Sequence, residues 1–204
     1  MGKAPIIDLY IDLISPYCYL AHTQLPGIAD RFGAELVYRP MHIATAKIAA
    51  GNFGPSNMEV PSKFAALRRD LERWATRYNV PFNFPRSIAG ELWNIALLHS
   101  QRAGMARRFA TLAFDRLWGE GGDPADPDLL RSSIELAGLD AEETMAFVNS
   151  NEGRAAFRKA CVEAHQGGIF GAPIMIVGYE LFWGNDRLDF LAEHLEQVCA
   201  GSAS

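Results

Sequence analysis

The chain has 204 residues, of which 49% are hydrophobic and 21% charged, and its formal net charge is −5. A chain of this length can bury one substantial core, and this composition is ordinary for a soluble globular protein. The negative charge gives no electrostatic support to a nucleic-acid or anionic-membrane partner, and no apolar run is long enough to span a bilayer.

The first predicted element is a strand. Ile6 to Ile14 is an apolar run interrupted only by Asp8, Tyr10 and Asp12. Because acids interrupt the run and no small-residue cleavage site follows it, we interpret it as a buried strand and not as a signal peptide.

A long helix and a second strand are predicted next. Pro16 suits the first turn of a helix, where its missing N–H costs nothing, and Gly33 is predicted to cap the C-terminus. Pro26 falls inside this span and is expected to kink the helix. Glu35 to Ile43 is predicted to be a strand, which a crossover helix would place parallel to the first.

The middle of the chain is predicted to be helical. Apolar residues recur at three- and four-residue steps in a first long helix. Gly119 to Pro127 is predicted to be a flexible connection, and Asp140 and Glu143 have the spacing of a capping box at the start of a later helix. The apolar stripe consists of Phe64, Leu67, Leu71, Trp74 and Tyr78.

The last predicted elements lie between Phe170 and Leu188. An apolar run follows Ala172-Pro173, a turn is expected at Gly178, and a second run ends before Asn185-Asp186-Arg187, which opens an amphipathic helix. The predicted fold class is therefore α/β, with the order β-α-β, helices, β-β-α. We assign residues 1–50 and 166–204 to one domain and residues 51–165 to an all-helical insertion domain.

Cysteine and histidine spacing gives no metal-site pattern. Cys18, Cys161 and Cys199 form no close pair, and the five histidines form no H-x-x-x-H pair, so no metal ligands are predicted. An odd cysteine count without a secretion signal favours reduced thiols and a cytoplasmic location.

Motifs at both ends of the chain together resemble one family. Ser15-Pro16-Tyr17-Cys18 occupies the place of the C-x-x-C site of thioredoxin-like proteins, and Ala172-Pro173 that of their cis-proline loop. KIAAGNFGPSN (Lys47 to Asn57) and FWGNDRL resemble the bacterial 2-hydroxychromene-2-carboxylate isomerases, close relatives of kappa-class glutathione transferases. Over the whole chain, this resemblance implies a thioredoxin-like fold, glutathione as cofactor, a small aromatic substrate and a homodimer.

Ser15 and Cys18 each have two interpretations. Ser15 is a favoured helix N-cap residue, and the resemblance implies that its hydroxyl also faces the sulfur of glutathione. Cys18 near a helix start could have a lowered pKa, but a disulfide-exchange enzyme needs its attacking thiol at the exposed first position, which Ser15 occupies. We interpret Cys18 as a small buried thiol.

The two C-terminal motifs are also open to more than one interpretation. Asn185 or Asp186 could cap a helix, whereas the resemblance implies that Asn185, Asp186 and Arg187 together bind glutathione as a clamp. In this clamp Arg187 and the helix start attract the γ-glutamyl carboxylate, and Asp186 holds the ammonium. An X-Pro bond is trans by default, whereas the resemblance implies a cis bond between Ala172 and Pro173, with Ala172 pairing with the cysteinyl part of glutathione.

Asn52 and Lys63 are further candidate glutathione ligands. Exposed polar loop residues are usually solvated, but the resemblance places an asparagine of the G-N motif beside the thiol-bearing part of glutathione and a lysine near its glycine carboxylate. Trp74, Trp93 and Trp118 are expected in the core of the insertion.

The resemblance implies one activity, and the residues leave alternatives. The implied reaction is the glutathione-dependent interconversion of 2-hydroxychromene-2-carboxylate and trans-o-hydroxybenzylidenepyruvate in aromatic (naphthalene-type) degradation. A kappa-like glutathione transferase would use the same thiolate. A thiol-disulfide oxidoreductase would use Cys18, and a binding module without chemistry would not need the Ser15 hydroxyl.

Overall fold

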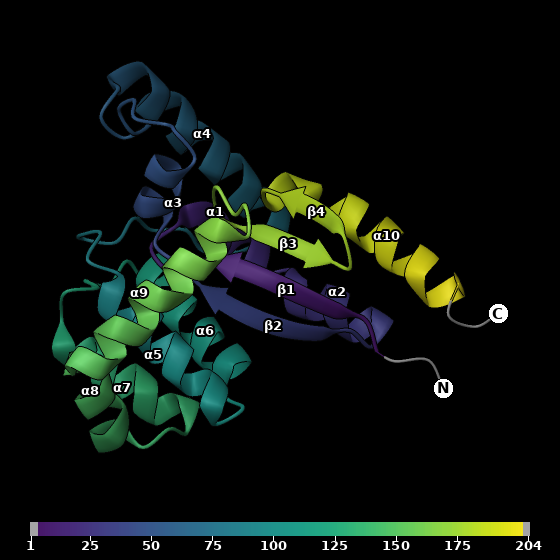
Figure 1. Ribbon diagram of the computed structural model, residues 1–204. Helices are drawn as coiled ribbons and strands as arrows, with labels where there is room; N and C mark the ends of the chain where they lie inside the picture. The colour runs from purple at the N-terminus through teal and green to yellow at the C-terminus, as the bar shows by residue number, and fades with distance from the viewer. Residues whose placement is uncertain (1–3, 202–204) are drawn as a thin grey trace.

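A four-stranded sheet forms the centre of the computed structural model, which describes residues 4–201 (Figure 1). The strands are β1 (Ile6–Ile11), β2 (Glu35–Pro40), β3 (Ile174–Val177) and β4 (Glu180–Trp183), in the spatial order β2-β1-β3-β4. β1 and β2 are parallel, whereas β3 pairs antiparallel with both β1 and β4. The predicted order of elements along the chain and the parallel first pair are confirmed, although β1 and β2 each end three residues earlier than expected.

Alternation along the strands gives the sheet two different faces. Leu9, Met175 and Phe182 are cross-strand neighbours and therefore share one face. The ring of Phe182 lies 5.7 Å from that of His194 in α10 (Leu188–Gly201), so this face is the one that α10 covers. Figure 1 shows α2 and α10 behind the sheet.

Two helices, and not one kinked helix, connect β1 to β2. α1 spans Pro16–His22 and α2 spans Leu25–Phe32, with Pro26 in the first turn of α2. The expected kink was wrong because the chain breaks fully between the helices, which places the proline where no N–H is needed. Gly33 ends α2 in the left-handed region, at φ 59°, as predicted.

The chain between β2 and β3 is helical. Figure 1 shows α3 and α4 on one side and α5 to α9 bundled at the end of the sheet. Asp140 caps α8 by accepting from the Glu143 N–H at 2.9 Å, which confirms the predicted helix start. Within residues 4–201 the Glu143 side chain does not return a bond to the Asp140 N–H, so only half of the capping box forms. The elements are α3 (Ile43–Ala49), α4 (Pro61–Tyr78), α5 (Glu91–Arg102), α6 (Ala106–Phe114), a π-helical turn (Asp115–Gly119), α7 (Pro127–Ala137), α8 (Ala141–Asn149) and α9 (Asn151–Gln166).

The core extends without a break from the sheet into these helices. Trp93 on α5 is fully buried, and its indole Nε1 donates to the Pro124 carbonyl at 2.9 Å. None of the helices within residues 4–201 combines the length and the apolar character needed to cross a bilayer.

Candidate active site

Ser15 caps the first helix at the carboxyl end of β1. Its backbone is extended (φ −97°, ψ 122°), and its Oγ accepts from the Cys18 N–H at 3.4 Å. Only 5% of the residue is exposed. The predicted cap is therefore present, and because capping uses the hydroxyl only as an acceptor, the hydroxyl can also donate its proton to a second partner, of which the Cys18 sulfur is one within reach.

Cys18 is a buried thiol beneath this cap. The residue has no exposed surface, and burial raises its pKa to about 12, a shift that the hydrogen bond to Ser15 only partly opposes. A thiol with this pKa is protonated at neutral pH and cannot attack a disulfide. The structure thus agrees with the interpretation of Cys18 as a packing residue.

The Ala172–Pro173 peptide bond is cis and lies beside the end of β1. Tyr10 pairs with Ile174, so the proline directly precedes the part of β3 that neighbours the C-terminal end of β1. The Pro173 carbonyl accepts from the Gly184 N–H at 3.0 Å. This bond joins the cis-proline loop to the segment that follows β4.

Asn185, Asp186 and Arg187 form a short 3-10 turn before α10, and the cap interpretation of this motif is wrong. Neither Asn185 nor Asp186 makes a side-chain capping bond in the described part of the chain. Asn185 is instead 3% exposed, and its buried Nδ2 has no hydrogen-bond partner among residues 4–201. The half-exposed Asp186 and Arg187 lie 3.3 Å apart. Gly184 adopts φ 107°, and a Cβ there would collide with the Asp186 carboxylate.

Helix α4 connects two of these segments. The Tyr17 hydroxyl donates to Asp70 at 2.7 Å, and the Tyr78 hydroxyl donates to the Asn185 carbonyl at 3.0 Å. Burial, the bond to Asp70 and the nearby charge of Asp186 all raise the pKa of Tyr17, so this phenol stays protonated. The roles of Asp70 and Tyr78 were not predicted.

Asn52 and Lys63 are not joined by hydrogen bonds to the other predicted site residues. Both are exposed, and neither side chain makes a hydrogen bond or ion pair within residues 4–201. The Lys47 ammonium holds the intervening loop by donating to the carbonyls of Gly54, at 3.0 Å, and Pro55, at 3.3 Å.

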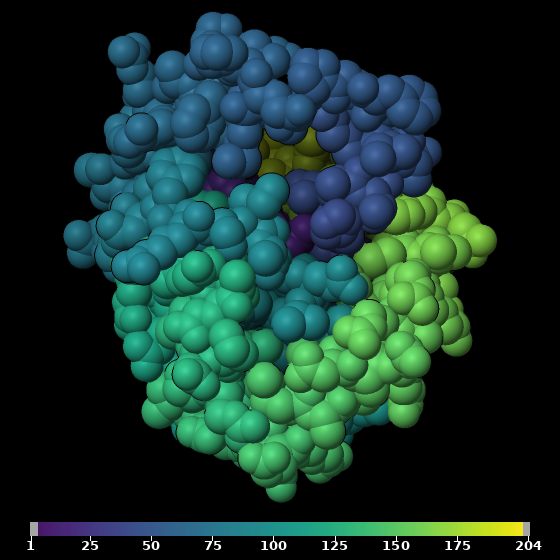
Figure 2. Space-filling view, turned by 90° about the vertical axis from the view of Figure 1, so that its left-hand side faces the viewer, coloured from purple at the N-terminus to yellow at the C-terminus, as the bar shows by residue number. Residues whose placement is uncertain are grey.

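Figure 2 shows a hollow in this face of the molecule. Purple atoms from the N-terminal part and yellow atoms from the C-terminal part are visible at its floor, and blue and teal segments from the helical region form its rim. The segment that carries Asn52 and Lys63 falls in the blue part of the colour range. The two ends of the chain therefore meet at the bottom of a cleft that the helical region walls.

Asp12, which the sequence shows only as an exception in an apolar run, is fully buried beneath the turn that precedes Ser15. Its Oδ1 accepts from the Asn94 amide at 2.8 Å and from the Ile14 N–H at 3.2 Å, and its Oδ2 accepts from the Ile43 N–H at 3.0 Å. The role of Asp12 was not predicted. An acidic residue three positions before the S-P-Y-C motif was the sequence signal that could have indicated this role.

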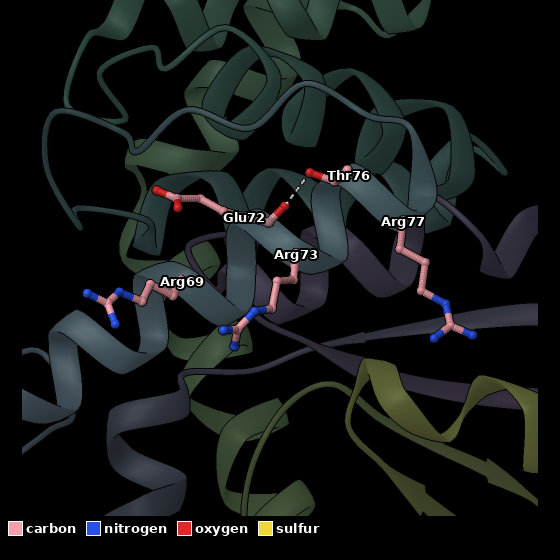
Figure 3. A pocket seen from close by; sticks show the side chains of 5 residues that line it. All are labelled: Arg69, Glu72, Arg73, Thr76 and Arg77. Atoms are coloured by element: carbon pink, nitrogen blue, oxygen red, sulfur yellow. Dashed lines mark hydrogen bonds between the residues drawn. The ribbon is translucent and has the colours of Figure 1, made fainter.

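A second depression lies on the outer side of α4 (Figure 3). Its lining side chains are all exposed, and none of the predicted glutathione ligands is among them. Within residues 4–201, no group of three or more His, Cys, Asp or Glu side chains could hold a metal ion. The lining residues of the depression are Arg69, Glu72, Arg73, Thr76 and Arg77.

Comparisons with known proteins agree with this geometry. The family model of the DSBA-like thioredoxin domain matches residues 6–196. Over 189 residues, the chain is 50% identical to 2-hydroxychromene-2-carboxylate isomerase of Sphingobium xenophagum, covering 93% of this chain and 97% of that one. Human glutathione S-transferase kappa 1 is 23% identical, with 98% and 96% of the two chains covered.

Solved structures show the same relationship. A structure of 2-hydroxychromene-2-carboxylate isomerase matches with a TM-score of 0.92 and 34% identity, covering 97% of this chain and 98% of that one. The cytosolic disulfide reductase DsbM of Pseudomonas aeruginosa with GSH has a TM-score of 0.66 and 17% identity, covering 94% and 98%, which supports the thioredoxin-like fold alone.

Proposed function

The chain belongs to the family of DSBA-like thioredoxin domains and is an isomerase of the 2-hydroxychromene-2-carboxylate type, and we propose that it uses glutathione as its thiol cofactor. The observation that carries the cofactor is the pair formed by Ser15 and Cys18. The first position of the motif holds a hydroxyl, and the only thiol of the motif is buried and neutral. The nucleophile must therefore come from a bound molecule.

The proposed reaction is a reversible addition by the glutathione thiolate. The hemiketal of the chromene first opens: its ring C–O bond breaks, the hydroxyl becomes the ketone, and its proton passes to the released phenol oxygen. Sulfur then bonds to a carbon of the conjugated double bond, and the electron pair moves to the ketone oxygen as an enolate. The former double bond can then rotate. Collapse of the enolate breaks the C–S bond and returns the thiolate, so nothing is consumed. Ser15 donates a hydrogen bond that keeps the sulfur ionised and aligned.

The unreactive parts of glutathione are assigned to the other site residues. Arg187 and Asp186 hold the carboxylate and the ammonium of the γ-glutamyl group. Asn185 is assigned to the same clamp, and its buried Nδ2 has no partner within residues 4–201. Ala172, before the cis-Pro173, pairs with the cysteinyl backbone. Asn52 lies toward the thiol-bearing residue, and Lys63 binds the glycine carboxylate. The half-exposed Asp186 and Arg187 support this assignment, because their charges are accessible.

The decisive experiment is a test of glutathione dependence with the chromene carboxylate as substrate. Dialysed enzyme should be inactive and should recover on addition of glutathione, whereas S-methylglutathione should bind without supporting turnover. Full turnover of dialysed enzyme would refute the thiolate mechanism. Conjugation of glutathione to electrophiles, measured in parallel, separates the isomerase from the alternative kappa-like transferase.

A homodimer in the cytoplasm completes the proposal. Leu181 and Trp183 pair with Ile176 and Ile174, so they lie on the sheet face opposite α10, and both are exposed. This face supports pairing with a second copy, and the three free cysteines support a reducing compartment. Leu181→Lys should sediment as a monomer, and a wild-type monomer at micromolar concentration would refute the dimer.

A further inference from the structure

The turn between β1 and Ser15 is held by side chains of the helical region. Asp12 is a fully buried carboxylate without an ion-pair partner in the described part of the chain, so three hydrogen-bond donors alone compensate its charge. A buried charge costs several kcal/mol unless such bonds are made. Asp12 directly follows an apolar strand, where a hydrophobic residue would avoid this cost. We therefore expect its carboxylate to serve a purpose that a hydrophobic side chain could not.

The side chains of Asn94 and Trp118 form hydrogen bonds to the backbone N–H and C=O of Leu13 in this turn. The Asn94 Oδ1 accepts from the Leu13 N–H at 3.0 Å, while its Nδ2 donates to Asp12. The Trp118 indole donates to the Leu13 carbonyl at 2.9 Å. Both backbone groups of Leu13 are thus bound by side chains that lie more than 80 positions away in the sequence.

Helix α5 packs closely against the turn. Gly90, just before α5, lies so close that a Cβ there would come within 2.9 Å of the Ile14 Cβ. The Asp12 carboxylate also accepts from the first N–H of α3, at Ile43. One carboxylate therefore fixes the turn, the start of α3 and helix α5 relative to one another.

We propose that Asp12, Asn94 and Trp118 are positioning residues that hold the Asp12–Ile14 turn so that the Ser15 hydroxyl meets the bound thiolate. The proposal rests on the function proposed above. A carboxylate suits position 12 because it accepts several bonds and donates none, whereas an asparagine would direct an N–H at a donor. The negative charge itself disfavours a nearby thiolate, so geometry is the advantage that the carboxylate supplies.

Two tryptophans provide a matched test. Trp118→Phe removes one buried indole bond to the Leu13 carbonyl, whereas Trp93→Phe removes a bond of equal length, 2.9 Å, whose acceptor is the Pro124 carbonyl and not a group of the turn. Trp118→Phe should lower kcat on the order of tenfold, raise the pKa of the bound thiol and leave the glutathione Kd unchanged. Trp93→Phe should lose similar stability with kcat within about twofold.

A charge exchange tests the same turn in another way. Asn94→Asp would place two carboxylates 2.8 Å apart and should reduce kcat more than Trp118→Phe does. The double variant Asp12→Asn with Asn94→Asp restores one amide–carboxylate bond. It should recover part of the kcat and return the pKa of the bound thiol toward the wild-type value, a readout that a change in overall stability alone would not move.

The outcomes separate the two proposals. If wild-type enzyme requires glutathione but Trp118→Phe and Trp93→Phe have equal kcat and equal thiol pKa, the positioning role is refuted and the proposed function stands. Turnover of the wild type without glutathione would refute the function itself. Failure of Asn94→Asp to fold leaves the tryptophan pair to decide.

Discussion

The buried and the exposed residues of the candidate site differ in how they are held. Ser15, Ala172 and Asn185, here called the floor residues, are buried, and backbone and side-chain bonds from several elements fix their segments. Asn52 and Lys63, here called the rim residues, are exposed, and their side chains lack hydrogen bonds within residues 4–201. The floor is preorganised for chemistry, whereas the rim must lose side-chain freedom when a ligand binds, which costs affinity.

The largest expected effect comes from removing the Ser15 hydroxyl, which is proposed to face the reacting sulfur. Ser15→Ala should lower turnover about 10²–10³-fold near neutral pH and raise the pKa of the bound thiol, because one preorganised donor is lost. Loss of the cap should cost the fold about 1 kcal/mol or less. The ultraviolet absorbance of the thiolate, followed against pH, measures the shift, and an active variant with an unshifted thiol would contradict the assignment.

A smaller effect, on glutathione binding instead of turnover, is expected in the turn that contains the half-exposed Asp186 and Arg187. Removing Asp186 or Arg187 should cost about 1.5–3 kcal/mol, or one to two decades in glutathione affinity, because each makes a charge-assisted contact. Turnover at saturating glutathione should change much less, because this end of the ligand does not react. Calorimetry on Arg187→Met and Asp186→Asn measures the affinity, and unchanged values for both variants would leave the motif without a binding role.

A pH experiment tests the burial of His22 on helix α1. Burial, with a smaller effect of Arg107, lowers the pKa of His22 on α1 from 6.5 to about 3, and its Nε2 lies 2.9 Å from the Tyr38 hydroxyl. The unfolded chain binds this proton more readily, so stability is complete above about pH 6.5 and falls by about 1.4 kcal/mol per pH unit toward pH 3. Urea unfolding of wild type and His22→Gln should show a shallower acid decline in the variant. Parallel declines would mean that other groups dominate.

The smallest effect is expected at Cys18. Cys18→Ser exchanges a neutral thiol, whose pKa burial raises to about 12, for a hydroxyl of similar size, so isomerase turnover should change less than about threefold. Disulfide reductase activity should be absent from both proteins. A variant that loses all activity would reverse the roles given to Ser15 and Cys18.

The local features of the site were predictable because they depend on neighbouring residues. A serine before Pro16 predicted the cap, Gly33 predicted the end of α2, and two apolar runs separated by a turn at Gly178 predicted β3 and β4. The cis bond before Pro173 followed from family resemblance, not from a residue pattern. The break between α1 and α2 was missed because a proline inside a helical pattern is compatible with a kink or a new helix start.

The sequence by itself determined the order of the elements, the cap at Ser15 and the family to which the motifs belong, since these depend on residue types a few positions apart. Only the tertiary structure decided that Asn94 bonds to Asp12 across 82 positions and Tyr78 to Asn185 across 107. Such bonds leave no periodic signal, because a hydrogen bond depends on where folding places two groups and not on their separation along the chain. The chemistry of the site is therefore encoded locally, and its rigidity is set by the helices that pack around it.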